Sequence, residues 1–155
     1  MTSAPRRAGW ELGVELLAAS RALFDELHAR LAAQGHPDLR PAHGYAFRAI
    51  GAEGATASEL ARGLGVTKQA AGKMAAELEA LGYVTRALDP HDARRRPLVL
   101  TARGGDALER SAAIFDELRD AWAHRAGAAE LERAADTLAS LSDLYGRPGA
   151  LRPVW

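Results

Sequence analysis

The amino-acid sequence predicts a mainly α-helical fold with one small β-hairpin. Apolar residues recur at helical spacing along most of the 155-residue chain, and one segment interrupts this pattern with two short β-branched or aliphatic runs. Because 48% of the residues are apolar, the chain can bury a working core. We therefore expect one compact domain, or one domain with an added oligomerisation element.

Composition excludes several classes of protein. The sequence has no apolar run of about 18 residues that would span a bilayer, and its N-terminal stretch MTSAPRRAGWELG lacks the apolar region of a secretory signal. We therefore expect a cytoplasmic protein. Cysteine is absent, which excludes disulfides, thiolate zinc sites and thiol-based redox sensing. The net charge of zero argues against a purely non-specific nucleic-acid binder, yet residues 67–105 carry seven Lys or Arg against four Asp or Glu.

Two helices are predicted before this basic segment. The first covers residues 10–31, where one stripe is apolar because large apolar residues recur at every seventh position, namely Trp10, Leu17, Phe24 and Leu31. The glycine and proline of the sequence GHP end it. Pro41 suits the first turn of a second helix, which extends to Ile50.

A helix-turn-helix is predicted next. Thr56 and Glu59 have the spacing of a capping box, in which each side chain satisfies an amide at the helix start, and Thr67 is a natural N-cap for the following helix. Gly82 ends that helix. Because only the sequence LGV joins the two helices, they must cross steeply, and the second one presents its N-terminal half outward.

The outward half of the second helix carries residue types that suit DNA. Lys68 and Lys73 are cations for phosphates, and the amide of Gln69 is able to contact an adenine edge. Ala70 is small enough to permit close approach. With the capping Thr67, these residues are the candidate DNA contacts of the helix. The alternative is an ordinary surface helix with two lysines.

A β-hairpin follows directly, formed by the sequences YVTRAL and RPLVL around an acidic, proline-containing turn. Pro97 lacks an amide hydrogen and fits an edge strand, so the ladder should be small and exposed. A hairpin behind a helix-turn-helix is a wing. Its arginines, Arg94, Arg95 and Arg96, would suit a narrow and strongly negative minor groove, and the alternative for them is a solvated hairpin tip.

Residues 57–101 resemble the DNA-binding core of the MarR family, the multiple-antibiotic-resistance type of winged-helix regulators. The matching pieces are SELA and LGVTKQ in the two helices, LEALGYV leading into the wing, and DPHDAR followed six residues later by LT. The resemblance implies a winged helix-turn-helix with dimerisation through one long N-terminal and two long C-terminal helices. Two departures are Gly72, where a larger residue is usual, and RRP, where the family usually has smaller or aliphatic residues.

The resemblance and strand alternation together predict different roles for the three arginines. The leucines of RPLVL take the packed face, so Arg96 starts on that side and Arg95 points the other way. Arg94 lies at the turn, within reach of Asp89 or Asp92. We expect Arg94 to pair with one of these aspartates and fix the shape of the wing, whereas Arg95 and Arg96 need no such partner.

Two further amphipathic helices are predicted after the wing. Thr101 can cap the first, and the sequence GAAE separates it from the second. Each has an apolar residue at every seventh position: Leu108, Phe115 and Trp122, then Leu131, Leu138 and Tyr145. Narrow stripes at the two ends of the chain need partners, either within the chain as an ordinary bundle or across a homodimer. A twofold homodimer would match a palindromic operator.

These expectations divide the chain into four parts. They are an N-terminal dimerisation helix in residues 1–36, a winged helix-turn-helix DNA-binding module in 37–101, C-terminal dimerisation helices in 102–146 and a tail in 147–155. The tail would either wrap a partner subunit through Val154 and Trp155 or be loose.

Enzymatic and metal sites are not expected. The sequence has no cysteine nucleophile, no phosphate-binding glycine loop and no H-E-x-x-H pair, and no cofactor is implied. A zinc site formed by His36, His43 and nearby acids is the alternative to a solvated surface role for these histidines.

The resemblance places a small-molecule pocket between the dimer helices and the DNA-binding module. Its candidate lining residues are Trp10, His43, Tyr45, Phe47 and Arg48, and the alternative is that the aromatic side chains belong to the core. The resulting hypothesis is a sequence-specific DNA-binding transcriptional regulator, a homodimeric repressor released by a small-molecule effector. The alternative is a winged-helix module that binds protein, or that binds DNA without sequence preference as nucleoid proteins do.

Overall fold

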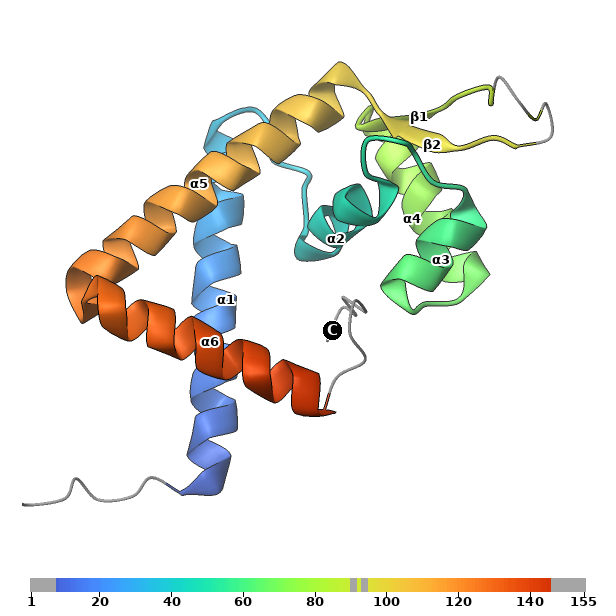
Figure 1. The fold of residues 1–155 in the computed structure, drawn as a ribbon. Coiled ribbons are helices and arrows are strands. Elements are labelled where there is room, and N and C mark those ends of the chain that lie inside the picture. Colours follow the sequence, from blue (N-terminus) through green and yellow to red (C-terminus); the bar gives the residue numbers. More distant parts are fainter. Residues whose placement is uncertain (1–7, 90–91, 93–94, 146–155) are drawn as a thin grey trace, which may run out of the picture.

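The computed structural model describes residues 8–89, 92 and 95–145, with no side-chain description for 142–145. The described residues form six helices and one hairpin (Figure 1): α1 (Gly9–Ala33), α2 (Pro41–Ile50), α3 (Ala57–Leu64), α4 (Lys68–Ala80), β1 (Val84–Arg86), β2 (Leu98–Leu100), α5 (Ala102–Ala126) and α6 (Ala128–Tyr145). The predicted class, mainly α with a small β-hairpin, is confirmed. One expected boundary is wrong, because α6 begins directly after Gly127 and the sequence GAAE is not a separate linker.

Threonine caps fix the starts of three helices, as their sequence predicted. At α3 the capping box is complete: the Glu59 amide donates to Thr56 Oγ1 at 3.2 Å, and the Thr56 amide donates to the Glu59 carboxylate at 2.7 Å. Thr67 caps α4 and Thr101 caps α5 in the same way, each accepting a backbone amide at 3.1 Å. Such a cap contributes about 1 kcal/mol to stability, so these threonines place the helices that carry the site.

The hairpin is short and joins the helices through its second strand. β1 pairs antiparallel with β2, and Val84 lies opposite Leu100. On its other side β2 bonds to Ala55, whose amide and carbonyl both pair with Leu98. The ladder is small, as expected, but only partly exposed: Thr85 and Arg86 are exposed, whereas Val84, Leu98 and the preceding Pro97 are buried. The ladder is therefore firmly attached to the helix-turn-helix at its base.

One hydrophobic core unites the middle of the chain with one half of each neighbouring long helix. Its largest fully buried side chains are Leu31, Leu60, Leu64, Leu78, Tyr83, Val84, Leu98 and Ile114. Burial of each such side chain contributes roughly 1.5–3 kcal/mol. Since α1 and α5 contribute Leu31 and Ile114 to this core, the long helices are attached to the winged module at one end.

The other ends of the long helices lie outside this core. Figure 1 shows α5 running from the hairpin to the turn at Gly127, where α6 folds back, while α1 contacts α5. No residue in 9–26 or in 119–141 is buried. Large apolar side chains are exposed there instead, namely Trp10, Leu12, Val14, Leu16, Leu17, Trp122, Leu138 and Leu141. In the described part of the chain, no helix combines the length and apolar character needed to cross a membrane.

Candidate nucleic-acid interface

The N-terminal half of α4 is the exposed face of the helix-turn-helix. Ala71, Ala75 and Leu78 are buried and recur at helical spacing, so they pack this helix onto the core. The opposite positions are exposed, and they include each candidate contact predicted on this helix: Thr67, Lys68, Gln69, Ala70 and Lys73. Neither lysine nor Gln69 uses its side chain in a hydrogen bond or ion pair with another described residue. These side chains are therefore available to an outside ligand.

Gly72 adds a steric feature to this face. It follows Gln69 by three positions and precedes the exposed Ala76 by four, so it lies on the same face of α4. A Cβ atom at Gly72 would meet no atom within 4 Å. Packing inside the protein therefore does not require glycine here, although glycine costs a helix about 1 kcal/mol relative to alanine. Close approach by an external surface is a physical reason for it.

Arg95 holds the wing against the start of α3. Its guanidinium donates to Asp89 at 2.8 Å and to the Glu59 carboxylate at 3.1 and 3.2 Å. Hydrogen bonds from Thr56 lower the pKa of Glu59, and Arg95 lowers it further. The expectation that Arg95 needs no partner is wrong, because this side chain turns back to where two carboxylates meet. Sequence reasoning missed the role of Glu59, whose capping position was the available signal.

Arg96 differs from its neighbour. Its side chain is exposed, and it has no ion-pair partner within the described residues. The expectation that Arg96 starts on the packed side is wrong, because β2 begins only at Leu98 and strand alternation does not extend back to it. Arg94 and its predicted pairing with an aspartate lie outside the described residues. Of the described wing arginines, Arg96 is thus the one available to a groove.

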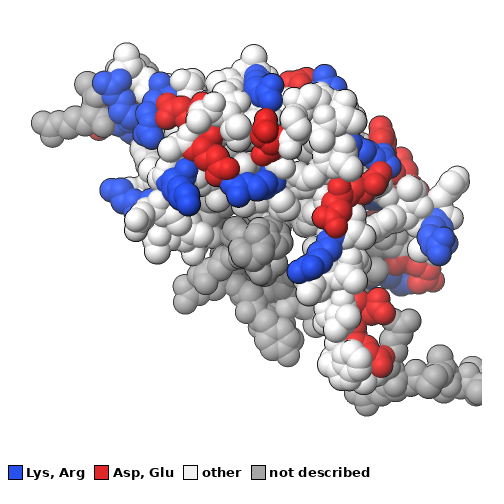
Figure 2. Space-filling view, turned by 180° about the vertical axis from the view of Figure 1, so that it is seen from behind, with Lys and Arg blue, Asp and Glu red and all other residues white. Residues whose placement is uncertain are grey.

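Charge is mixed over much of the surface. Figure 2, which views the molecule from behind, shows acidic and basic side chains interspersed on that face, with no large area of one sign. This agrees with the net charge of zero. Attraction to a polyanion must therefore come from local groups such as the two lysines of α4 and Arg96, and not from the field of the whole molecule.

A cavity of about 350 Å³ lies between α1, α2 and α5. Its wall is mainly apolar and aromatic, with a few polar side chains, and includes Phe24, Leu27, His28, Leu31, Arg40, Tyr45, Phe47, Arg48, Ser111 and Phe115. Three of the five residues predicted for a pocket, Tyr45, Phe47 and Arg48, line it. Trp10 does not, because it is exposed at the far end of α1, and His43 is fully buried outside the lining.

Arg40 connects this cavity to α4. It lines the cavity, and its guanidinium forms an ion pair with Glu77 of α4. The Arg40 backbone amide donates to Nδ1 of His43 at 3.3 Å, and His43 Nε2 lies 3.3 Å from a guanidinium nitrogen of Arg40 and 3.8 Å from Glu77 Oε1. Burial lowers the pKa of His43, Arg40 lowers it further, and Glu77 opposes both. Sequence reasoning missed this cluster, whose members come from two helices.

The expected solvated role of His36 and His43 is wrong. Their side chains are only 3% and 0% exposed, because His36 contacts Tyr83 and Asp106 while His43 lies against Arg40 and Glu77. Among the described residues, no three His, Asp or Glu side chains are grouped so that they would hold a metal ion.

Known proteins match both the sequence of the module and the fold. Residues 38–95 match the model of the MarR family. RV1404 from Mycobacterium tuberculosis has 20% sequence identity and a TM-score of 0.73, over 94% of this chain and 100% of its own. The S. aureus MepR–DNA complex has 22% identity and a TM-score of 0.65, over 86% and 98% of the two chains.

A third similar structure is the transcriptional regulator Tm0710 from Thermotoga maritima, with 24% identity and a TM-score of 0.58, over 87% of this chain and 94% of its own. A comparison with curated protein sequences finds no match. At these identities the solved structures show a shared fold, a winged helix-turn-helix with long flanking helices. The family match spans α2, the helix-turn-helix and the wing up to Arg95, so this part of the chain is similar in sequence to the MarR family.

Proposed function

We propose that the protein is a sequence-specific DNA-binding transcriptional regulator that acts as a homodimer. The observation that carries this proposal is the exposed N-terminal half of α4, where Lys68, Gln69 and Lys73 lie without partners within the described chain. The similarity of residues 38–95 to the MarR family supports it. One similar structure, that of S. aureus MepR, is a complex with DNA.

Each element of the interface has a distinct role in this proposal. Lys68 and Lys73 bind phosphates and position α4 in the major groove, where Gln69 contacts a base edge. Thr67 and Ala70 permit close approach of the first turn. Arg96 enters the adjacent minor groove. Arg95 holds the wing in place. Arg94 lies outside the described residues, and its predicted DNA contact is part of the proposal.

The homodimer is proposed to form through the exposed apolar parts of the long helices. Residues 1–36 and 102–146 would then be the dimerisation segments, flanking the DNA-binding module in 37–101. Exposed Trp10, Val14 and Leu17 form a stripe on α1, and Leu138 and Leu141 are exposed on α6. Such large exposed apolar surfaces mark interaction sites. Twofold symmetry would place two α4 helices about 34 Å apart, facing an inverted repeat.

We further propose that the cavity binds an effector that releases the protein from DNA, which makes it a repressor. Its volume lies in the range of ligand pockets, and aromatic walls with Arg40 and Arg48 suit an aromatic molecule that carries an anionic group. S. aureus MepR, one of the similar structures, was solved with ethidium bromide. A ligand that bonds to Arg40 would compete with Glu77 and so reach α4 directly.

This function requires no catalysed reaction and no cofactor, and it places the protein in the cytoplasm with its DNA. The competing hypothesis is a winged-helix module that binds protein, or DNA without sequence preference. Gln69 favours specific binding, because an exposed amide serves base recognition more than phosphate contact.

Selection from a random duplex library tests the proposal. The expected result is enrichment of one inverted repeat, bound by a particle of twice the chain mass, with an affinity that falls by about three orders of magnitude between 50 and 200 mM salt. Gln69→Ala should keep the non-specific affinity and lose discrimination among operator variants. Salt-dependent binding without any enriched sequence would establish the non-specific alternative, and absence of DNA binding would leave the protein-binding one.

A further inference from the structure

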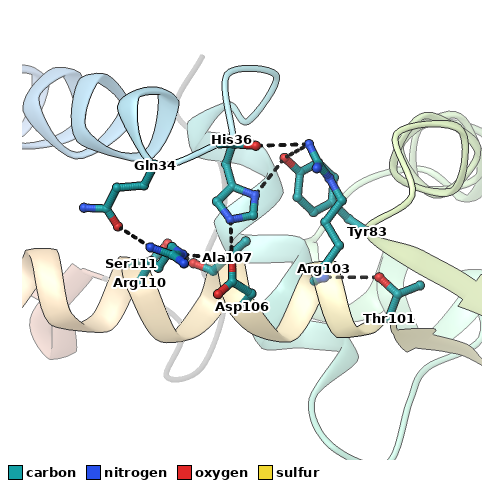
Figure 3. Close-up of polar contacts among 11 residues, drawn as sticks. Gln34, His36, Tyr83, Thr101, Arg103, Asp106, Ala107, Arg110 and Ser111 are labelled. Carbon is teal, nitrogen blue, oxygen red and sulfur yellow. Dashed lines mark hydrogen bonds and ion pairs between the residues drawn. The ribbon is translucent and has the colours of Figure 1, made fainter.

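Four side chains form a hydrogen-bonded cluster, the polar joint, which consists of the buried His36 and Tyr83, the partly exposed Asp106 and the exposed Arg103 (Figure 3). His36 Nδ1 lies 3.1 Å from the Tyr83 hydroxyl, and His36 Nε2 lies 2.8 Å from Asp106 Oδ2. The Arg103 guanidinium lies over the Tyr83 ring at 4.6 Å and donates to the Tyr83 hydroxyl at 3.1 Å. Tyr83 is fully buried and His36 is 3% exposed.

Two hydrogen bonds of the polar joint have a fixed direction. Arg103 can only donate, so the Tyr83 oxygen accepts from it. The Asp106 carboxylate can only accept, so His36 Nε2 donates to it, and Nδ1 on the other side of the ring pairs with the Tyr83 hydroxyl. Arg110 donates to the same carboxylate oxygen at 2.8 Å. Arg110 and then His36 lower the pKa of Asp106, which keeps it an acceptor. Each side chain of the polar joint therefore has a defined hydrogen-bond partner within the protein.

The backbone around the polar joint is equally constrained. The Thr101 amide donates to the Tyr83 carbonyl at 3.0 Å, and the Thr101 hydroxyl donates to the Gly82 carbonyl at 2.7 Å. At Gly104 a Cβ atom would lie 2.2 Å from the backbone carbonyl oxygen of Tyr83. The first turn of α5 thus contacts the segment between α4 and β1 without an intervening side chain.

The polar joint lies where the long helices meet the winged module. His36 follows α1, Tyr83 lies between α4 and β1, and Arg103 with Asp106 belongs to the first turns of α5. Since Thr101 alone connects β2 to α5, this residue is the point about which α5 would otherwise pivot. Apolar contacts tolerate sliding, whereas directional hydrogen bonds fix an orientation.

We propose that the polar joint fixes the angle between α5 and the helix-turn-helix, and thereby sets the separation of the two α4 helices in the dimer. His36, Tyr83, Arg103 and Asp106 are positioning residues, which select the spacing of operator half-sites without touching DNA. The inference rests on the proposed homodimer.

A distance measurement without DNA tests the inference. Because the chain has no cysteine, Ala76→Cys on the exposed face of α4 gives one spin-label site per protomer. Pulsed electron paramagnetic resonance should give one narrow distance for the otherwise unchanged protein. Tyr83→Phe, which removes one hydroxyl and keeps the ring, should broaden that distribution about twofold or more, and Asp106→Asn should do the same. Ser58→Ala is the control, since it removes an exposed hydroxyl from α3 outside the joint and should leave the width unchanged.

Operator spacing provides the second readout. On selected duplexes whose central spacer is changed by one or two base pairs, the parent should bind one spacing best, while Tyr83→Phe should flatten this preference and keep its affinity for a single half-site. Equal distance widths and equal spacing preferences in parent and Tyr83→Phe would overturn the role of the joint and leave the proposed function standing. Absence of any interprotomer distance in the parent would overturn the homodimer, and the inference with it. If Asp106→Asn does not fold, Tyr83→Phe decides alone.

Discussion

The winged module and the outer halves of the long helices differ in how completely they bury their apolar residues. The module buries Leu60, Leu64, Leu78 and Leu98 within a single chain. By contrast, residues 9–22 of α1 and the described side chains of α6 contribute nothing to the core, although they are similarly rich in large apolar residues. The first region buries its apolar side chains within one chain, whereas the second leaves them exposed, which is the arrangement that the proposed homodimer requires.

The two regions also use charge differently. In the module, buried or half-buried polar groups have defined partners, as Arg95 does in Asp89 and Glu59. On the outer helices, ion pairs such as Arg119 with Glu132 are exposed on both sides and contribute little to stability. Substitutions should therefore change assembly in the outer region and change stability or geometry in the module.

The largest expected effect is on assembly. Val14→Asp combined with Leu17→Asp places two charges on the exposed stripe of α1, where the side chains are 55% and 51% exposed in a single chain. Sedimentation should show half the parent mass. Operator affinity should fall by about 100-fold or more, because binding through two linked half-sites is lost.

Leu88→Asp is the control for this assembly test. Leu88 is 67% exposed, but it lies in the hairpin and not on the long helices, so the mass should not change. A dimer that persists in the α1 variant would show that the exposed stripe of α1 does not form the dimer interface.

The next largest effect should separate two adjacent glycines in α5. Gly104→Ala would place a Cβ atom 2.2 Å from the backbone carbonyl oxygen of Tyr83, so α5 must move. We expect a loss of about 1–3 kcal/mol in the free energy of urea unfolding. Gly105→Ala meets no atom within 4 Å and should stabilise the same helix by up to about 1 kcal/mol. Equal effects of the two substitutions would show that the close contact does not constrain α5.

A smaller effect should distinguish the two described wing arginines. Arg96→Ala should lower operator affinity about tenfold and reduce the salt dependence by about one phosphate equivalent, with unchanged thermal unfolding. Arg95→Ala should also lower the midpoint of unfolding, because it removes the contacts to Asp89 and Glu59. Fluorescence anisotropy across a salt series, together with melting curves, makes the comparison. Identical affinity and salt dependence for Arg96→Ala and the parent would show that Arg96 does not contact DNA, and the wing would then be only a solvent-exposed hairpin.

The contrast between local and long-range interactions explains which features were predictable from the sequence. Helix starts were predictable, because capping by Thr56, Thr67 and Thr101 involves residues three positions apart. The exposed face of α4 followed from helical spacing. The partners of Arg95 and His36 were not predictable, because Glu59 and Asp106 lie 36 and 70 positions away in the sequence. Burial of the histidines depends on the same long-range packing.

The smallest expected effect concerns pH and again contrasts the two regions. His43 is fully buried in the module, and burial with the nearby Arg40 lowers its pKa below the usual 6.5, although Glu77 opposes this shift. The unfolded chain therefore binds a proton more readily than the folded one just below pH 6.5. The contribution of neutral His43 to the stability of the folded chain is present above that pH and is lost as the pH falls through the lowered pKa.

Urea unfolding at pH 7, 6 and 5 tests this last contrast. The free energy of unfolding of the parent should decrease toward pH 5, and His43→Gln should make that decrease smaller by up to about 1 kcal/mol. His124→Gln is the matched control, because His124 is exposed on α5 and its substitution should leave the pH dependence unchanged. If His43→Gln and the parent lose the same free energy between pH 7 and 5, the buried cluster with Arg40 and Glu77 does not control the acid sensitivity of the module.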